Sequence, residues 1–284
     1  MQLPAPFFAF DRVSRGYRYR EIGKIGIFSV PGLDALPGVD HGFSARGGGV
    51  SSGGYASLNL SFTKDFEREN VAENYRRFCK AAGIDPASIV MDNYEHGTTV
   101  LRVDSGDRGK GYTLPPLPRC DGLVTDDPAV TLVTGHADCM AFYAVDPVRR
   151  CIGLAHAGWR GALGRIGRIM IEKMAAEFRA DPGRMVMAVG PSICGGCFEV
   201  GNDVADLFTD AFPGLPCRFV NGKTGKAHID LWMVAAAQFM EAGVAAENIH
   251  LAALCTMEDE RLFSYRRSTM ETGVGGMAAY LRLK

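Results

Sequence analysis

The stretch Cys151-Ile-Gly-Leu-Ala-His-Ala-Gly-Trp-Arg-Gly161 constrains the fold more than any other part of this chain. It opens with a short apolar run that is typical of a buried strand. Beyond it, residues 163–178 carry apolar side chains three or four positions apart, which line one face of an amphipathic helix. The segment therefore predicts a strand that passes through Gly158 and Gly161 into the start of a helix.

The junction of this strand and helix is a candidate ligand site. The first backbone N–H groups of a helix have no partner within it, and the helix dipole places partial positive charge there. An anion can bind at such a position, and Arg160 beside it carries a guanidinium suited to phosphate. His156 would lie at the carboxyl end of the strand, where catalytic groups collect in α/β architectures. These residues predict a functional site at the junction.

Bulk properties exclude several classes of protein. The chain has 284 residues, of which 22% are charged, and a formal net charge of −1. This balance gives no electrostatic footprint for nucleic acid or an anionic membrane. No apolar run approaches the ~18–20 residues that span a bilayer, and the N-terminus lacks the cationic start of an export signal. We therefore expect a cytoplasmic protein whose eight cysteines are thiols or metal ligands rather than disulfides.

Three side chains form a candidate metal site: His96, Cys139 and His156. Each follows or ends an apolar segment and is bordered by small residues. A thiolate with two imidazoles suits zinc, and three protein ligands leave a fourth tetrahedral position open, which is the catalytic arrangement. The long gaps between the three residues match no local zinc-finger pattern. The alternative is a core thiol with two histidines bonded to backbone carbonyls.

The neighbours of Cys139 have two interpretations each. Asp138 could orient a ligand histidine or move a proton, or it could cap a turn. His136 could be a spare ligand or could face the sheet.

A second cysteine motif, Cys194-Gly-Gly-Cys197, has CxxC spacing. It lacks both the second pair of a zinc site and the surroundings of a thioredoxin-like redox motif. The residues alone favour a glycine-rich turn with two small apolar thiols.

The glycine-rich segment 41–54 contains Arg46 and is followed by a strand-like run that includes Asn59. Such composition is found in disordered linkers, but embedded apolar residues and the arginine favour a loop whose backbone approaches a ligand.

Helical and strand-like segments are mixed along the whole chain, which predicts one compact domain, residues 25–284, after an N-terminal arm, residues 1–24. Helices are predicted at 65–82, after Gly161, at 202–212 and at 231–242. Strands are predicted at 25–30, 89–103, 121–125, 130–134, 140–145, 185–189, 249–254 and 277–283.

Read together, several motifs resemble the laccase-domain family, also called the multicopper polyphenol oxidase or purine nucleoside phosphorylase family. The resemblance covers most of the chain. Its motifs are His41-Gly-Phe-Ser-Ala-Arg-Gly-Gly-Gly-Val-Ser51, Ser57-Leu-Asn-Leu60, Glu95-His-Gly97, Ala137-Asp-Cys139, His156-Ala-Gly-Trp-Arg-Gly161, Gly190-Pro191 with Phe198-Glu-Val200, and Cys255-Thr256 with Phe263-Ser-Tyr-Arg-Arg267.

The resemblance implies an α+β fold, a layered sandwich of mixed β-sheets flanked by helices. It also implies a zinc site, with copper as the alternative metal, whose ligands are His96, Cys139 and His156. On this basis we assign catalytic roles to Asp138, Cys139 and Arg160, and contacts with substrate or phosphate to Arg46, Asn59, Gly158 and Arg160.

The implied activity is phosphorolysis of adenosine, inosine or S-methyl-5'-thioadenosine, together with deamination of adenosine. The partners would be purine nucleosides and phosphate, and a homodimer is one option for the assembly. The sites predicted from the residues support the same activity, because phosphorolysis needs an anion-binding site and both reactions benefit from an open metal site.

The chain departs from the family pattern at three places. Tyr94-Glu95 stands where Gln-Val is usual, His136 where threonine is usual, and Gly276 where an arginine often closes the last motif. These departures concern the pocket wall and substrate preference, not the metal ligands.

The sequence leaves two alternative functions open. One is copper-dependent phenol oxidation, although the six histidines of the chain are few for a trinuclear copper cluster. The other is a partner-binding protein that retains a vestigial site.

Overall fold

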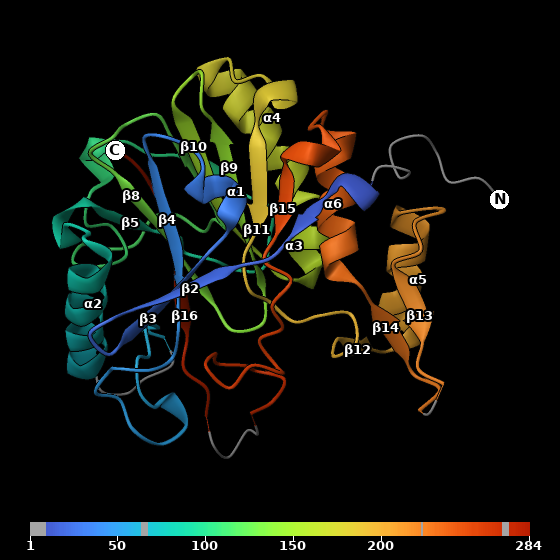
Figure 1. The fold of residues 1–284 in the computed structure, drawn as a ribbon, viewed down its shortest axis with the longest axis horizontal. Coiled ribbons are helices and arrows are strands. Elements are labelled where there is room, and N and C mark those ends of the chain that lie inside the picture. Colours follow the sequence, from blue (N-terminus) through green and yellow to red (C-terminus); the bar gives the residue numbers. More distant parts are fainter. Residues whose placement is uncertain (1–9, 64–67, 223, 269–272) are drawn as a thin grey trace.

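The structure is a computed structural model that describes residues 10–63, 68–222, 224–268 and 273–284. These residues form six α-helices and sixteen strands, and the strands belong to three sheets (Figure 1). The two larger sheets pack on each other, and helices cover their outer faces.

The first large sheet has six strands and is mixed. In spatial order its strands are β2 (Arg18–Ile22), β3 (Ile25–Ser29), β4 (Val39–Ser44), β16 (Met277–Leu283), β8 (Thr131–His136) and β5 (Ile89–Met91). Only β5 and β8 run parallel. The C-terminal strand therefore lies in the middle of the sheet, beside a strand from the beginning of the chain.

The second large sheet has seven strands and is also mixed. Its order is β1 (Ser14–Arg15), β15 (Ile249–Leu251), β11 (Val186–Val189), β9 (Met140–Asp146), β10 (Cys151–Ala157), β7 (Gly122–Thr125) and β6 (Val100–Arg102). The central strands β9 and β10 form an antiparallel pair in which His156 lies opposite Ala141.

Alternation along β9 shows how the layers are built. Met140, Phe142 and Ala144 pack in the cluster that includes α4 (Ile166–Phe178) and α6 (Leu231–Glu241). The intervening residues Tyr143 and Val145 pack between the two large sheets. Successive side chains of a strand point to opposite faces, so a strand that is apolar throughout must be covered on both sides.

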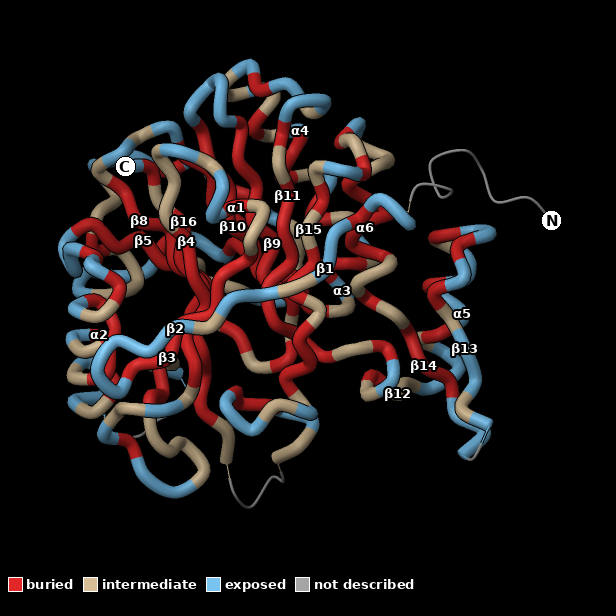
Figure 2. Tube along the Cα trace, viewed as in Figure 1, coloured by how far each residue is buried: buried red, intermediate tan, exposed pale blue. Residues whose placement is uncertain are grey.

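Helix α2 (Arg68–Ala82) covers the outer face of the six-stranded sheet through an apolar stripe that includes Val71, Tyr75 and Phe78. Its other face is largely exposed (Figure 2). The order of layers is therefore α2, six-stranded sheet, seven-stranded sheet, and then α4 with α6. The predicted sandwich of mixed sheets flanked by helices is confirmed.

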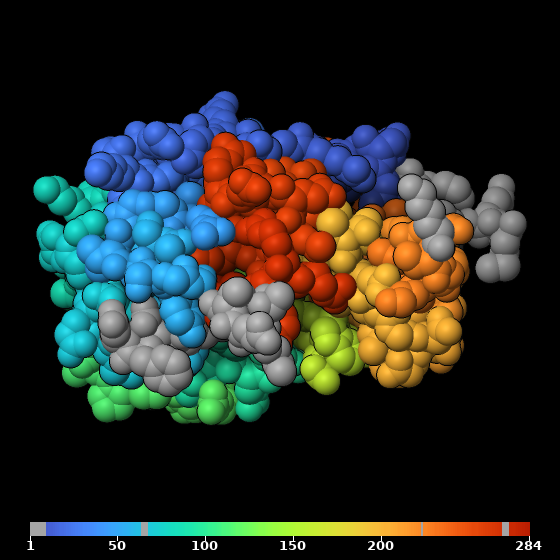
Figure 3. Space-filling view, turned by 90° about the horizontal axis from the view of Figure 1, so that it is seen from below, coloured from blue at the N-terminus to red at the C-terminus, as the bar shows by residue number. Residues whose placement is uncertain are grey.

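A smaller unit projects from the edge of this sandwich (Figure 1). It contains the three-stranded sheet of β12 (Glu199–Val200), β14 (Ala227–Ile229) and β13 (Arg218–Val220), together with α5 (Asn202–Ala211). Buried side chains such as Ala205 and Phe208 join it to the main core. In the space-filling view, the segment around residue 160 (yellow-green) reaches the surface between the C-terminal part of the chain (red) and this unit (orange) (Figure 3).

Most predicted elements are present, but two predictions are wrong. Residues 89–103 do not form one strand, because β5 and β6 belong to different sheets. The helix after Gly161 is divided into α3 (Trp159–Leu163) and α4, which begins after Arg165 adopts a left-handed conformation. The predicted start of the helix at 65–82 lies outside the described residues, as do residues 1–9 of the predicted arm. The described part of that arm contributes β1 and β2 to the edges of the two large sheets.

Candidate metal centre and the adjoining pocket

The structure brings His96, Cys139 and His156 together. One ligand atom from each lies within 4.8 Å of the others. His96 comes from the connection between β5 and β6, Cys139 from the turn between β8 and β9, and His156 from the end of β10. Antiparallel pairing of β9 with β10 places the turn that carries Cys139 beside His156. Strand ends from both large sheets therefore meet at one point.

Asp121 holds this arrangement in place. One of its carboxylate oxygens accepts hydrogen bonds from Nδ1 of His156, at 3.0 Å, and from the backbone N–H of His96, at 2.9 Å. The other oxygen accepts from the amides of Glu95 and Gly97. These bonds fold residues 95–97 around the carboxylate, and His96 adopts a φ of 64°. Because Nδ1 is engaged by Asp121, Nε2 of His156 would be its donor for a metal, which would displace the proton from that nitrogen.

The charge of Asp121 follows from these contacts. Burial alone would raise the pKa of its carboxyl, but the hydrogen bonds from His156 and from the amides of Glu95 and Gly97 lower the pKa below its usual value. Sequence reasoning missed this residue. The only available signal was an aspartate at the start of a strand, which does not distinguish a ligand-orienting carboxylate from an ordinary turn residue.

Cys139, which is partly buried, and His156, which is buried, form a pair of opposite charge. Burial would raise the pKa of the thiol, but the charge of His156 and hydrogen bonds from His156 and His96 lower it to about 6. Burial would lower the pKa of His156, but the Cys139 thiolate and Asp121 raise it to about 10. A site that favours the thiolate in this way suits a divalent cation, which binds thiolate rather than thiol.

The backbone beside the three ligands leaves room for a metal ion. A Cβ atom at Gly158 would lie 2.9 Å from Cδ2 of His96 and 3.3 Å from Sγ of Cys139. Any other residue would therefore crowd the ligands. Two imidazoles and one thiolate are a donor set for zinc, so the residues fit a zinc ion with one coordination position open. The contact of Gly158 with substrate or phosphate stays a prediction, and what the structure shows is the space that this glycine leaves beside the ligands.

Asp138 and His136 are fixed by hydrogen bonds. The carboxylate of Asp138 accepts from the hydroxyl of Thr256, the hydroxyl of Ser264 and the backbone N–H of Arg266. His136 hydrogen-bonds through its two ring nitrogens to Thr134 Oγ1 and to the carbonyl of Cys139. His136 therefore faces the sheet and supports the Cys139 turn, whereas Asp138 lies in the wall of the pocket.

A pocket of about 580 Å³ adjoins the three ligands. Its lining includes the ligands, Trp159 and Arg160, as well as Phe198 and, from α5 of the projecting unit, Val204. The guanidinium of Arg160 lies 4.2 Å from the centre of the Trp159 ring. Cavities of this size and mixed lining commonly hold small organic ligands.

Arg46 and Asn59, assigned to substrate or phosphate in the sequence, do not line this pocket. Arg46 donates to the carbonyl of Ala56 and lies over the ring of Phe263. The side chain of Asn59 is buried and accepts from the amides of Ser61 and Gly276.

The glycine-rich loop around Arg46 packs against its own chain. A Cβ atom at Gly49 would lie 2.0 Å from the carbonyl oxygen of Ser57. The approach of this loop to a ligand stays a prediction, and in the structure the backbone of Gly49 packs closely against that of Ser57.

All eight cysteines lie in the described part of the chain and carry free thiols. No helix among the described residues is long and apolar enough to cross a membrane.

Comparison with known proteins now identifies the family. The family model described as "Multi-copper polyphenol oxidoreductase laccase" matches residues 40–284. The chain belongs to this laccase-domain family. The predicted resemblance is confirmed over a region that contains all three metal-ligand candidates.

Curated relatives of the laccase-domain chain carry two enzyme names. A purine nucleoside phosphorylase of Deinococcus radiodurans is 38% identical over 249 residues, which cover 86% of this chain and 92% of the relative. Adenosine deaminase RL5, from an unknown prokaryotic organism, is 32% identical over 243 residues, covering 84% of this chain and 92% of the relative.

A solved structure of the family has the same fold. The crystal structure of YlmD from Geobacillus stearothermophilus superposes with a TM-score of 0.85 and 29% sequence identity, covering 94% of this chain and 98% of that one. The layered arrangement of the two large sheets is therefore shared with this relative.

Proposed function

We propose that this chain is a zinc-dependent purine nucleoside phosphorylase that acts on adenosine, inosine or S-methyl-5'-thioadenosine and also deaminates adenosine. The observation that supports this most is the convergence of His96, Cys139 and His156 beside a pocket large enough for a nucleoside. The names of the relatives point in the same direction. Localisation in the cytoplasm remains a prediction.

The two reactions have different second substrates. In phosphorolysis, a phosphate oxygen forms a bond to C1' of the ribose while the bond from C1' to the purine nitrogen breaks, giving ribose 1-phosphate and the free base. In deamination, water replaces the amino group of adenosine, giving inosine and ammonia. A zinc ion held by the three ligands would act as a Lewis acid and lower the pKa of a bound water.

The protein's own residues have distinct tasks in this proposal. Arg160, in the pocket wall, binds the phosphate through its planar guanidinium and is held in place by stacking on Trp159. The rings of Tyr94 and Phe198 provide apolar surfaces for the purine. Asp138 exchanges a proton with the purine, because its carboxylate lies in the same wall and is oriented by three donors.

Asp121 acts through the ligands and does not touch the substrate. It fixes the tautomer and orientation of His156 and at the same time shapes the backbone that presents His96. We propose it as a positioning residue of the metal centre.

Copper-dependent phenol oxidation is not favoured. Six histidines are present, and the four other than His96 and His156 are hydrogen-bonded to protein groups: His41 to Val30, His136 to Thr134, His228 to Gly195 and His250 to Ser14. A trinuclear copper centre needs many converging imidazoles. Among the described residues, the one group of possible metal ligands with two histidines is that of His96, Cys139 and His156.

The decisive test is the dependence on phosphate. Adenosine is incubated with the zinc-loaded chain, with and without inorganic phosphate, and the products are separated. We expect ribose 1-phosphate and adenine only with phosphate, and inosine with ammonia in both samples. Absence of all four products would refute the nucleoside activity, and oxidation of an added phenol by the copper-loaded chain would support the alternative.

A further inference from the structure

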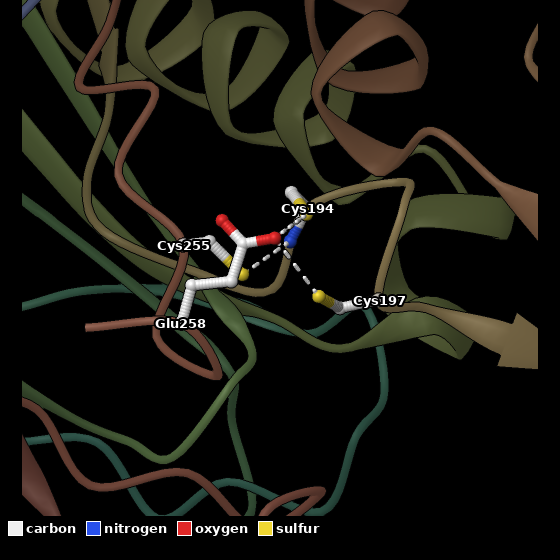
Figure 4. Close-up of side chains that lie close together, drawn as sticks. All are labelled: Cys194, Cys197, Cys255 and Glu258. Carbon is white, nitrogen blue, oxygen red and sulfur yellow. Dashed lines mark hydrogen bonds between the residues drawn. The ribbon is translucent and has the colours of Figure 1, made fainter. Parts of the chain in front are cut away.

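A second group of side chains that could bind a metal lies apart from His96, Cys139 and His156. Cys194, Cys197, Cys255 and Glu258 each direct one sulfur or oxygen atom to a common point, and these atoms lie within 4.8 Å of one another (Figure 4). The first two come from the connection between β11 and β12, and the other two from the connection between β15 and β16. We infer that these four side chains form a second metal site, which binds zinc or another thiophilic divalent cation.

The backbone brings the two segments together before any metal is considered. Ser192 forms an isolated bridge with Cys255, in which its N–H donates to Leu254 and its carbonyl accepts from Thr256. The N–H of Cys194 donates to Sγ of Cys255 at 3.4 Å. Three thiols from distant parts of the sequence are thus gathered by ordinary backbone pairing.

The turn between Cys194 and Cys197 directs both thiols to the same side. The amides of Cys197 and Phe198 both donate to the carbonyl of Cys194, at 3.1 and 2.9 Å. This compact turn places two sulfurs next to each other, as the CxxC spacing of zinc sites requires. The sequence alone favoured two apolar thiols here, because the other half of the site lies some 60 residues further along the chain, as the separation of Cys194 from Cys255 shows.

The contacts among the four side chains mark where a cation would lie. One carboxylate oxygen of Glu258 accepts hydrogen bonds from the thiols of Cys197, at 3.3 Å, and Cys194, at 3.7 Å (Figure 4). A divalent cation would replace these shared protons, which would leave to solvent as the thiols become thiolates.

The donor set and its geometry determine the kind of metal. Three thiolates and one carboxylate suit zinc, and Zn–S bonds of about 2.3 Å place tetrahedral sulfurs about 3.8 Å apart. Donor atoms within 4.8 Å need only small side-chain rotations to reach that separation. Four protein ligands complete the coordination sphere, which is the structural arrangement rather than the catalytic one.

Two arginines compensate the net negative charge of such a centre. Nη1 of Arg266 donates to the carbonyls of Cys197 and Glu199. Nη1 of Arg267 donates to the carbonyls of Thr256 and Met257, which lie between Cys255 and Glu258. Both ligand segments are therefore held by a guanidinium group.

The same segments build the wall of the catalytic pocket. The amide of Ile193 donates to the carbonyl of Asp138, and Thr256 and Arg266 donate to the carboxylate of Asp138. Ile193 and Phe198, which flank the CxxC turn, line the pocket. A metal at the second site would thus fix the position of Asp138 and of the pocket wall without contacting the substrate.

Counting bound zinc tests this site independently of turnover. The chain is loaded with zinc under reducing conditions, freed of loosely bound metal by gel filtration, and analysed for zinc per chain. We expect about two zinc ions for the wild type, about one for C194S/C197S, about one for C139S, and about two for the control C79A, which removes a buried thiol outside both groups. One zinc in the wild type that C194S/C197S retains in full would overturn the second site.

Cobalt provides a spectroscopic check. Loading with Co²⁺ should give thiolate-to-cobalt charge-transfer absorption dominated by the three-cysteine site, so C194S/C197S should lose most of it and C139S the smaller part. Equal spectra for the wild type and C194S/C197S would contradict the inference. A disulfide among Cys194, Cys197 and Cys255 in the purified, unreduced chain, with no second zinc after reduction, would also contradict it.

A further variant keeps the test valid if C194S/C197S does not fold. Glu258 is exposed, so E258Q should fold while replacing an anionic ligand with a neutral one. Its second zinc should be removed by a chelator at a lower concentration than in the wild type, while the zinc held by Cys139 stays. Equal resistance to the chelator would refute a role of Glu258 as ligand and, with it, the closed site.

Discussion

The two candidate metal centres border the same pocket wall, but their ligands differ in number and kind. The first offers two imidazoles and a thiolate, with Arg160 in the adjoining pocket. The second offers three thiols and a carboxylate, and its immediate neighbours are backbone carbonyls held by Arg266 and Arg267. Three ligands leave a coordination position for a reactant, whereas four leave none. The same kind of ion can therefore serve chemistry at one site and rigidity at the other.

The supporting residues differ in the same way. Asp121 orients the ligands of the first centre through four hydrogen bonds, and a metal there would be held by a prearranged set of side chains. At the second centre the thiols share protons with Glu258, and a cation would tie together two loops that backbone pairing brings near each other. Loss of metal should accordingly abolish turnover at the first centre and loosen the structure at the second.

The largest effect is expected from Cys139→Ala. Removing the only thiolate of the first centre should release its zinc and lower kcat/KM for phosphorolysis on the order of 1000-fold, about 4 kcal/mol in activation free energy. Stopped assays with adenosine and phosphate measure this, with C79A as control. Full turnover in the variant would show that the proposed centre is not the catalytic one.

The second-largest effect should distinguish the two centres by how much their zinc ions contribute to the free energy of unfolding. A strong chelator should lower the free energy of urea unfolding by about 3 kcal/mol for each zinc that it removes, because a ligand at ~100 times its Kd stabilises the native state by that amount. C194S/C197S retains only the zinc of the first centre, so the chelator should shift its free energy of unfolding by about 3 kcal/mol less than it shifts that of the wild type. An identical shift in both proteins would mean that the second cluster contributes no metal-linked stability.

Asp121→Asn should weaken the first centre alone. An asparagine can place an N–H group against Nδ1–H of His156 or against the amides of residues 95–97, so one set of donors loses its acceptor. We expect a loss of about 10–100-fold in zinc affinity or in kcat/KM. The zinc of the second centre should be unaffected, which competition with a chromophoric chelator can resolve. An unchanged affinity would show that orientation of His156 does not depend on this carboxylate.

The smallest effect concerns only the pocket side of the first centre. Arg160→Ala should raise the KM for phosphate about tenfold, since an exposed charged hydrogen bond contributes on the order of 1–2 kcal/mol. Deamination, which needs no phosphate, should change less, and Arg160→Lys should recover only part of the loss. Phosphate titrations of both reactions provide the measurement. Equal losses in the two reactions would argue against a phosphate-specific role.

Local pattern in the sequence predicted a large part of the molecule. The predicted apolar runs at 140–145 and 152–155 correspond to the central strands β9 and β10, and the C-terminal run corresponds to β16. The three ligands of the first centre were found because each stands at the end of such a run, and the family resemblance selected the same three residues. Side-chain periodicity is a local property, so a single sequence displays it directly.

Other features required the packing of distant segments. The role of Asp121 depends on β7 lying next to β10, and the second centre depends on the bridge between Ser192 and Cys255. Arg46 and Asn59 were assigned to substrate or phosphate from the sequence; in the structure Arg46 contacts Ala56 and Phe263, and Asn59 accepts from the amide of Gly276 beside β16. None of these relations has a short-range signature.

The sequence by itself determined most of the strands, which faces of them are apolar and which thiol and imidazoles stand at their ends, because these depend on the order of neighbouring residues. Only the tertiary structure decided which of the chemically suitable side chains share one point in space. Coordination depends on distances of a few ångströms between segments, and those distances are set when the two large sheets pack and their connecting loops are drawn together.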